Sequence, residues 1–150
     1  MPQPTQPHDL LLAYDFPPLG GGIARWMAEL AHGYPAGALV VSSGTMPGAE
    51  GSDASFPNSV DRVGVPAGRL KTAPGLMRWA HRATRLARAP GARFAWVGNL
   101  RPAAFPAKWA WERAGLPYGI LVHGGDILAL APKLARSRLK REIYRPILAD

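Results

Sequence analysis

A run of three glycines, Gly20–Gly22, stands directly before a segment with helical periodicity, and this arrangement suits the binding of an anion. Glycine backbone amides can approach phosphate oxygens closely, and the first N–H groups of a helix have no acceptor within the helix. The run is no dinucleotide fingerprint, because Arg25 occupies the place of the third glycine, and no Gly-Lys-Ser/Thr of a P-loop follows it. We expect a phosphate-facing loop; a plain flexible turn is the alternative.

His123 and Asp126 form a second group that could do chemistry, in the stretch VHGGD. The imidazole stands at the end of the apolar run GILV and before two glycines, a place from which it could hydrogen-bond a ligand. The alternative is a histidine that packs in the core.

Three further polar residues follow apolar runs: Asp15, Asn99 and Arg101. Each could touch a ligand, but Asn99 and Arg101 could equally form turns, and Asp15 could cap or brace its loop. No Ser/His/Asp trio and no spacing typical of metal ligands is evident in the sequence.

Apolar runs alternate with helix-like segments along the chain, and these elements must position the polar residues. Nearly continuous apolar runs predict strands that are covered on both faces, and apolar residues three or four apart predict helices. The expected strands are 9–16, 37–44, 60–66, 93–100 and 118–126 with its exit loop; the expected helices are 23–33, 75–89, 102–115 and 132–145, the last beginning at Pro132; and 46–59 is expected to be a surface loop.

Strands separated by helices indicate βαβ units and hence an α/β fold. We expect a doubly wound, mostly parallel sheet with helices on both faces, as in Rossmann-like domains. Such sheets bind ligands at the carboxyl ends of their strands, which share one edge. The polar residues should gather at that edge: Asp15, Gly20–Gly22, Asn99, Arg101, His123 and Asp126.

The composition describes one folded domain with an excess of positive charge. The 150 residues are 47% hydrophobic and 19% charged, they contain no cysteine, and their net charge is +8. Disorder, a disulfide framework and a thiolate metal site are thereby excluded, and no apolar stretch approaches the roughly 20 residues of a membrane span. We expect residues 1–9 to be a flexible lead-in without signal-peptide features, residues 10–150 to be one domain, and the protein to be cytoplasmic.

Two stretches resemble retaining glycosyltransferases of family 4. DFPPLGGGIARWMAELA is similar to the opening of these enzymes, where a strand runs into a Pro- and Gly-rich loop, and LVHGGDIL is similar to their later His-Gly strand exit. The order of expected elements matches their amino-terminal half over residues 10–150. The resemblance implies the GT-B architecture, with two Rossmann-like domains across a cleft and this domain on the acceptor side. The nucleotide-sugar-binding domain would follow Asp150, so that residues 1–150 alone should be inactive.

The resemblance also implies roles for individual residues. Gly21 and Gly22 match loop glycines near the diphosphate of the nucleotide-sugar donor. His123 matches the histidine that contacts the transferred sugar, which passes to an acceptor hydroxyl with retention, and Asp126 matches a site-edge position of variable use. Neither a metal nor another cofactor is implied, because the second domain stabilises the leaving diphosphate. Ala24 departs from the polar residue of some lipid-acceptor members, so their acceptor contacts are not carried over to it.

Basic residues recur at helical spacing on two expected helices. They are either solvated faces or a peripheral contact with an anionic membrane surface, where each close Lys or Arg contributes about 1 kcal/mol. These residues are Arg78, Arg82, Arg85 and Arg88, and later Lys133, Arg136, Arg138, Lys140, Arg141 and Arg145.

Other classes of function stay open on the sequence. A free-standing Rossmann-like module could bind a phosphorylated ligand or nucleic acid without catalysis; nucleic acid is disfavoured, because no RNA-binding signature is present. A nicotinamide-dependent enzyme is disfavoured by Arg25. The sequence leaves open the donor sugar, its nucleotide and the acceptor, which could be a sugar, a lipid-linked compound or another small molecule.

Overall fold

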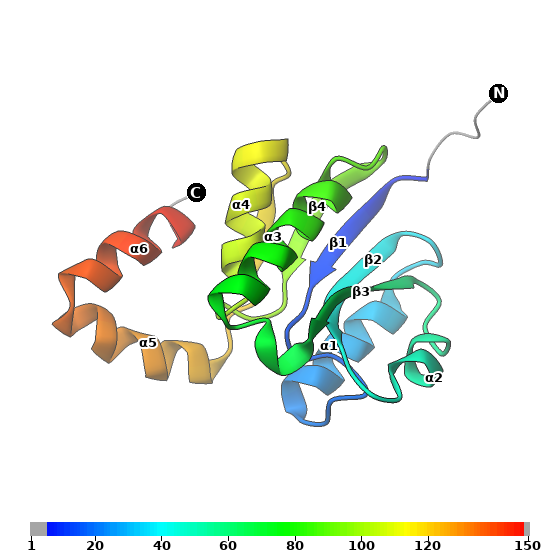
Figure 1. The fold of residues 1–150 in the computed structure, drawn as a ribbon, viewed down its shortest axis with the longest axis horizontal. Coiled ribbons are helices and arrows are strands. Elements are labelled where there is room, and N and C mark those ends of the chain that lie inside the picture. The colour runs from blue at the N-terminus through cyan, green and yellow to red at the C-terminus, as the bar shows by residue number, and fades with distance from the viewer. Residues whose placement is uncertain (1–5, 149–150) are drawn as a thin grey trace.

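The computed structural model describes residues 6–148, and within them a parallel sheet of five strands has the order β3-β2-β1-β4-β5 (Figure 1). In chain order the strands are β1 (His8–Leu12), β2 (Leu39–Thr45), β3 (Ser59–Pro66), β4 (Ala92–Val97) and β5 (Tyr118–Ile120). The central strand β1 pairs with β2 and with β4, so that Leu11 lies opposite both Val41 and Trp96. The predicted doubly wound α/β fold is confirmed.

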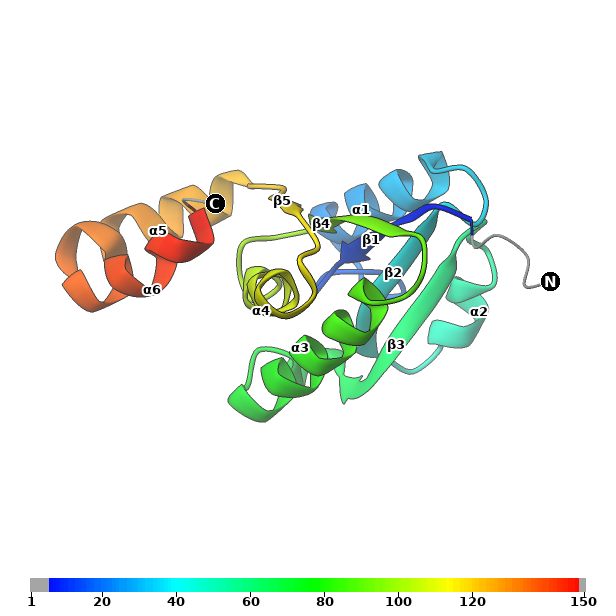
Figure 2. The same ribbon diagram turned by 90° about the horizontal axis from the view of Figure 1, so that it is seen from above.

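Helices cover both faces of this sheet (Figure 2). Helix α1 (Gly22–Gly33) lies on one face, and α3 (Ala73–Ala87) and α4 (Ala104–Ala114) lie side by side on the other. A short helix, α2 (Ala49–Asp53), occupies part of the segment predicted as a surface loop, and a 3-10 turn, η1 (Ala67–Arg69), precedes α3.

The core explains why the predicted elements form. Leu10 and Leu12 of β1 join Trp79 of α3 in one buried cluster, while Leu11 joins Met27 of α1 in the other. A strand with apolar side chains on both faces can thus be covered from both sides. The Trp79 indole N–H also donates to the Ser42 hydroxyl (3.1 Å), which satisfies a buried donor.

Strand β1 begins inside the segment predicted as a flexible lead-in. The His8 N–H donates to the Gly91 carbonyl (2.9 Å), and the Asp9 carboxylate accepts from the Tyr34 hydroxyl (3.0 Å). Residues 8 and 9 therefore belong to β1, which begins two residues before the predicted start of the domain at residue 10. Residues 1–5 of the predicted lead-in lie outside the described residues.

The last part of the described chain forms two helices, α5 (Gly124–Arg136) and α6 (Arg138–Leu148), where one helix over 132–145 was predicted. The prediction that a helix starts at Pro132 is wrong, because Pro132 lies inside α5. The helix starts earlier, where the Asp126 carboxylate accepts from the His123 N–H (3.2 Å) and caps it. Pro132 has no N–H, so it cannot donate the helical hydrogen bond to the Leu128 carbonyl.

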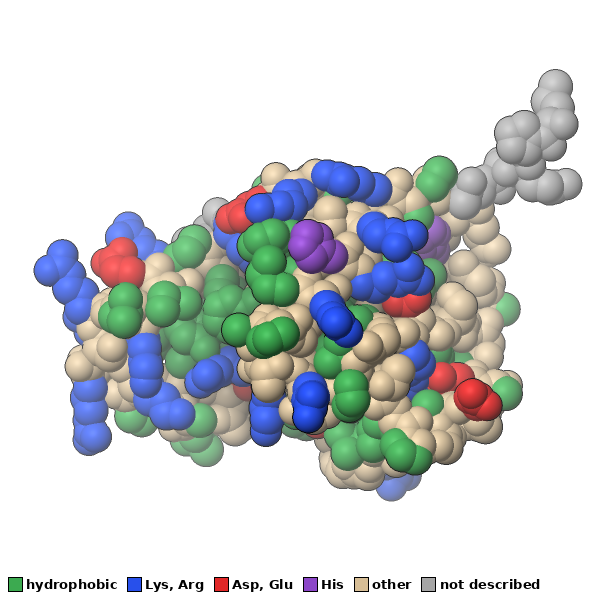
Figure 3. All heavy atoms as spheres, viewed as in Figure 1, with side chains coloured by type: hydrophobic (Ala, Val, Ile, Leu, Met, Phe, Trp, Pro, Cys, Tyr) green, Lys and Arg blue, Asp and Glu red, His purple; other side chains and the backbone are tan. Residues whose placement is uncertain are grey.

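Helices α5 and α6 form a pair, the α5–α6 hairpin, that projects from the sheet (Figures 1 and 2). It buries Leu130, Tyr144 and Ile147, and the Tyr118 hydroxyl ties it to β5 by donating to the Ile147 carbonyl (3.1 Å). Hydrophobic side chains gather in a hollow between α6 and α3–α4 (Figure 3), where an apolar groove has a volume of about 430 Å³. Other apolar side chains of the hairpin stay exposed: Ile127, Leu128, Leu139, Ile143 and Leu148. None of the described helices combines the length and the apolar character needed to cross a bilayer.

Candidate functional site

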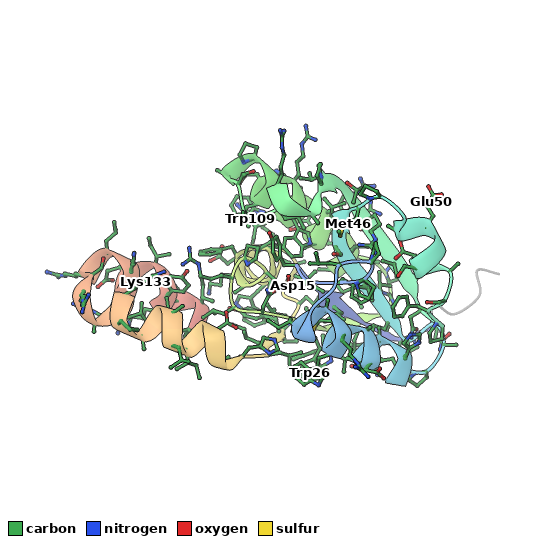
Figure 4. The ribbon with its side chains drawn as sticks, turned by 90° about the horizontal axis from the view of Figure 1, so that it is seen from below. Asp15, Trp26, Met46, Glu50, Trp109 and Lys133 are labelled. Carbon is green, nitrogen blue, oxygen red and sulfur yellow. The ribbon has the colours of Figure 1, made fainter. Side chains whose placement is uncertain are left out.

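Polar side chains from the connections after β1, β4 and β5 meet at the carboxyl edge of the sheet. The Asn99 side-chain amide donates to the Asp15 carboxylate (Nδ2–Oδ2 3.1 Å), and the charges of His123 and Asp126 both act on Asp15. Figure 4 places Asp15 between the start of α1 and α4. The structure thus brings together four of the residues that the sequence predicted for this edge.

The imidazole of His123 is held from two sides. Its Nε2 lies 2.7 Å from the Gly98 carbonyl oxygen, and because a carbonyl only accepts, Nε2 carries a proton and donates to it. The Trp26 ring of α1 meets the imidazole edge-on, with 5.3 Å between ring centroids and 84° between planes. Trp26 lies on the side of α1 toward the start of α5 (Figure 4). The orientation of the ring is therefore fixed before any ligand arrives.

Gly98 makes this arrangement possible because β4, β1 and α1 approach one another closely there. A Cβ at this position would stand 2.7 Å from the Met27 sulfur and 3.3 Å from the Leu12 carbonyl oxygen. A larger residue would push α1 or β1 away from the end of β4.

Asp126 connects two segments of the edge. Its carboxylate accepts from the backbone N–H groups of His123 (3.2 Å) and Leu100 (3.4 Å). It therefore caps α5 and ties this helix to the connection that follows β4. This structural duty was not foreseen when the sequence assigned Asp126 to the site edge.

Burial raises the pKa of Asp15 above its ordinary value of 3.8; the nearby His123 lowers it, and the Asp126 carboxylate raises it further. Asn99 is only 5% exposed, and within residues 6–148 its amide oxygen has no hydrogen-bond partner. The Asp15–Asn99 pair thus keeps an unused acceptor at the edge of the sheet.

The glycine run forms the loop that opens α1. Gly21 has φ 122°, a conformation that side chains rarely adopt, and Gly22 is the first helical residue. A hollow of about 520 Å³ lies against this loop and is lined by Gly20–Gly22, Pro17, Leu19, Arg25 and Ala28. The first N–H groups of α1 lack intrahelical acceptors, and Arg25 adds a positive charge, so the hollow suits an anion.

Arg101 does not join the polar cluster. Its guanidinium lies 5.9 Å from the centre of the Tyr144 ring of α6, and it makes no hydrogen bond or ion pair in the described part of the chain. Burial raises the pKa of Tyr144, and the charge of Arg101 opposes that shift. Arg101 therefore contacts the hairpin, and its predicted role at the ligand edge stays a prediction.

Three residues that matter at this edge escaped the sequence analysis: Trp26, Gly98 and Arg62. Trp26 stands one helical turn after the glycine run, and this spacing indicates that its side chain lies near the edge of the sheet. Gly98 immediately follows the apolar run of β4, where a glycine can mark a close approach. Arg62 contacts segments that are distant in the sequence, and no local pattern signals these contacts.

No group of three or more His, Cys, Asp or Glu side chains among residues 6–148 is arranged to hold a metal ion. In comparisons with known proteins, no protein-family model matches the chain, and no curated protein is significantly similar to it.

Proposed function

We propose that this chain is the amino-terminal, acceptor-side domain of a retaining GT-B glycosyltransferase, which transfers a sugar from a nucleotide sugar to an acceptor hydroxyl. The observation that carries the proposal is the juxtaposition, at one edge of a parallel sheet, of an oriented imidazole and a glycine-opened helix start. A nucleotide sugar needs both, because its diphosphate is anionic and its sugar presents hydroxyls. The motifs that resemble family 4 contribute these same two features.

In this proposal, different residues of the sheet edge bind different parts of the nucleotide-sugar donor. Backbone amides at Gly21 and Gly22 meet diphosphate oxygens, with Arg25 supplying positive charge beside them. His123 hydrogen-bonds the sugar, and the Asp15–Asn99 pair offers acceptors to hydroxyls of the sugar or of the acceptor. A second domain holds the nucleotide and helps to neutralise the leaving diphosphate, so transfer needs no metal.

Kinetics of the complete gene product test these roles, with release of nucleoside diphosphate measured over a panel of nucleotide sugars. His123→Ala should lower kcat on the order of 10²-fold, as expected for loss of one positioned contact, while the thermal midpoint stays near that of the wild type. A wild-type kcat in His123→Ala would overturn the proposed site.

Gly22→Val should instead raise the KM for the donor. No atom lies within 4 Å of a Cβ built on Gly22, so the valine fits the folded chain and obstructs the ligand. Gly33→Val is the matched control, because Gly33 ends the same helix and its Cβ also meets nothing within 4 Å. Equal KM values in the two variants would remove the loop from the donor site.

Calorimetry on residues 1–150 separates the proposal from a free-standing binding module. The proposal expects little affinity for a nucleotide sugar, because most of the donor pocket belongs to the second domain. Micromolar affinity of these residues, together with a gene product that shows no turnover, would favour the non-catalytic module.

A further inference from the structure

Arg62 occupies an unusual position for a residue of an edge strand. It belongs to β3, at the edge of the sheet, yet its side chain is only 12% exposed. The guanidinium forms a two-pronged pair with the Asp53 carboxylate at the end of α2 (Nε–Oδ2 3.0 Å, Nη2–Oδ1 2.6 Å). It also donates to the Gly44 carbonyl in β2 (2.9 Å).

The same guanidinium reaches the loop between β1 and α1. Its Nη2 donates to the Pro17 carbonyl, and its central carbon lies 5.6 Å from the centre of the Phe16 ring. Phe16 is itself buried against Leu11 and Met27. Arg62 thus joins the start of the glycine loop to β2, β3 and α2.

The glycine loop has little else to hold it. Gly20, Gly21 and Gly22 carry no side chains, and nothing lies within 4 Å of a Cβ built on any of them. Within residues 16–20 one backbone hydrogen bond is described, in which the Leu19 N–H donates to the Phe16 carbonyl (3.1 Å) and closes a turn. The conformation of the glycine loop must therefore be set by the two segments that flank it, α1 and Phe16–Pro17.

We propose that Arg62 is a positioning residue for the glycine loop. By fixing the Pro17 carbonyl it sets where the loop enters α1, and thus where the first N–H groups of α1 meet an anionic ligand. The ligand in this statement, a donor diphosphate, rests on the proposed function; the restraint on the loop does not. Arginine suits the task because its planar fork serves several acceptors at once, whereas a lysine offers one compact charge.

A second Arg–Asp pair, on the opposite face of the sheet, provides the matched control. Arg82 of α3 forms a two-pronged pair with Asp61 of β3 (Nε–Oδ2 2.9 Å) and has no described contact with the loop. The hydrogen bonds from Arg82 to the Asp61 carboxylate raise the pKa of Arg82. Arg62→Lys and Arg82→Lys therefore make the same chemical change in two similar pairs.

Nitrogen-15 relaxation of residues 1–150 measures the restraint directly. Order parameters at Gly20–Gly22 should fall in Arg62→Lys from the range of rigid backbone, about 0.85, to below about 0.6, and should be unchanged in Arg82→Lys. The amides of β1 should remain rigid in both variants. Unchanged order parameters at the glycines of Arg62→Lys would overturn the proposal, as would an equal loss in Arg82→Lys.

Donor kinetics of the complete gene product test the consequence for binding. Arg62→Lys should raise the donor KM about tenfold with kcat within about twofold of the wild type, while Arg82→Lys changes neither. A mobile loop with an unchanged KM would overturn the role of Arg62 in ligand positioning. A gene product without transferase activity would defeat the proposed function, and the relaxation result would still decide whether Arg62 restrains the loop.

Discussion

Asp15 and the glycine loop follow a strand that is buried on both faces, whereas His123 and Asp126 stand where a three-residue strand passes into the exposed α5–α6 hairpin. The first half of the candidate site is supported by β1, α1 and the Arg62 pair. The second half is held by a few hydrogen bonds, chiefly those of His123 to Gly98 and of Asp126 to Leu100. The two halves of one site therefore differ in how much packing supports them.

Side chains can therefore meet at the edge of the sheet even where the element that carries them is only weakly packed. Helix α5 buries Leu130 and α6 buries Tyr144 and Ile147, while α3 buries six residues, Trp79 among them. Since stability comes mainly from buried apolar area, substitutions in the two regions should have very different effects.

The largest expected contrast compares Trp79→Ala with Leu128→Ala. Trp79 is fully buried between α3 and the sheet, so its truncation should lower the free energy of unfolding by about 3–5 kcal/mol. Leu128 is exposed, and its truncation should change that free energy by less than about 0.5 kcal/mol. Urea unfolding followed by circular dichroism measures both. A large loss in Leu128→Ala would show that the hairpin is packed in solution, and the contrast would disappear.

An intermediate effect is expected for Asp126→Ala. This substitution removes the acceptor of the His123 and Leu100 N–H groups and should destabilise the start of α5 by about 1 kcal/mol. Trypsin cleavage within the hairpin should become several-fold faster, while the sheet stays resistant. Glu142→Ala, an exposed change on α6, is the control and should leave the cleavage rate unchanged. Equal cleavage rates in both variants would contradict the capping role.

The smallest effect concerns Asp15→Asn and the pH dependence of stability. Because burial raises the pKa of Asp15 in the folded protein, the unfolded chain releases this proton at a lower pH than the folded chain does. Stability is therefore lost as pH rises from about the ordinary value of 3.8 through the raised pKa. An asparagine keeps an acceptor for Asn99 and does not titrate, so the variant should gain stability relative to the wild type across that window. Urea titrations between pH 3.5 and 7 test this, and a difference independent of pH would count against it.

The sequence predicted most of the sheet and the helices α1, α3 and α4, because their apolar periodicity matches the faces that are buried. It also predicted that Asp15, Asn99, His123 and Asp126 meet, since that follows from parallel strands sharing an edge. The start of α5 was missed because the capping by Asp126 lies in a stretch that reads as a strand exit. The contact of Arg101 with Tyr144 was missed for a different reason: it joins two segments that are far apart in the sequence, and no local pattern signals it.

The contact of Arg62 with the glycine loop could not be predicted from the sequence for the same physical reason. Its contact with Pro17 joins residues 45 positions apart, and no local pattern signals such a pair. Hydrogen-bond partners of long side chains depend on the final packing of several segments, which periodicity does not specify.

The sparse burial of the α5–α6 hairpin also has a thermodynamic consequence. Elements with few buried contacts can open as a separate cooperative unit while the rest of the fold stays intact. Here the bonds of His123 and Asp126 would break in that opening, so the closed hairpin and the assembled site are one and the same state. A ligand that binds His123 therefore binds only that state. By linkage, its binding shifts the population of the whole hairpin toward the closed form. Ligand binding at the edge of the sheet would thus stabilise the packing of Ile147, at the far end of α6.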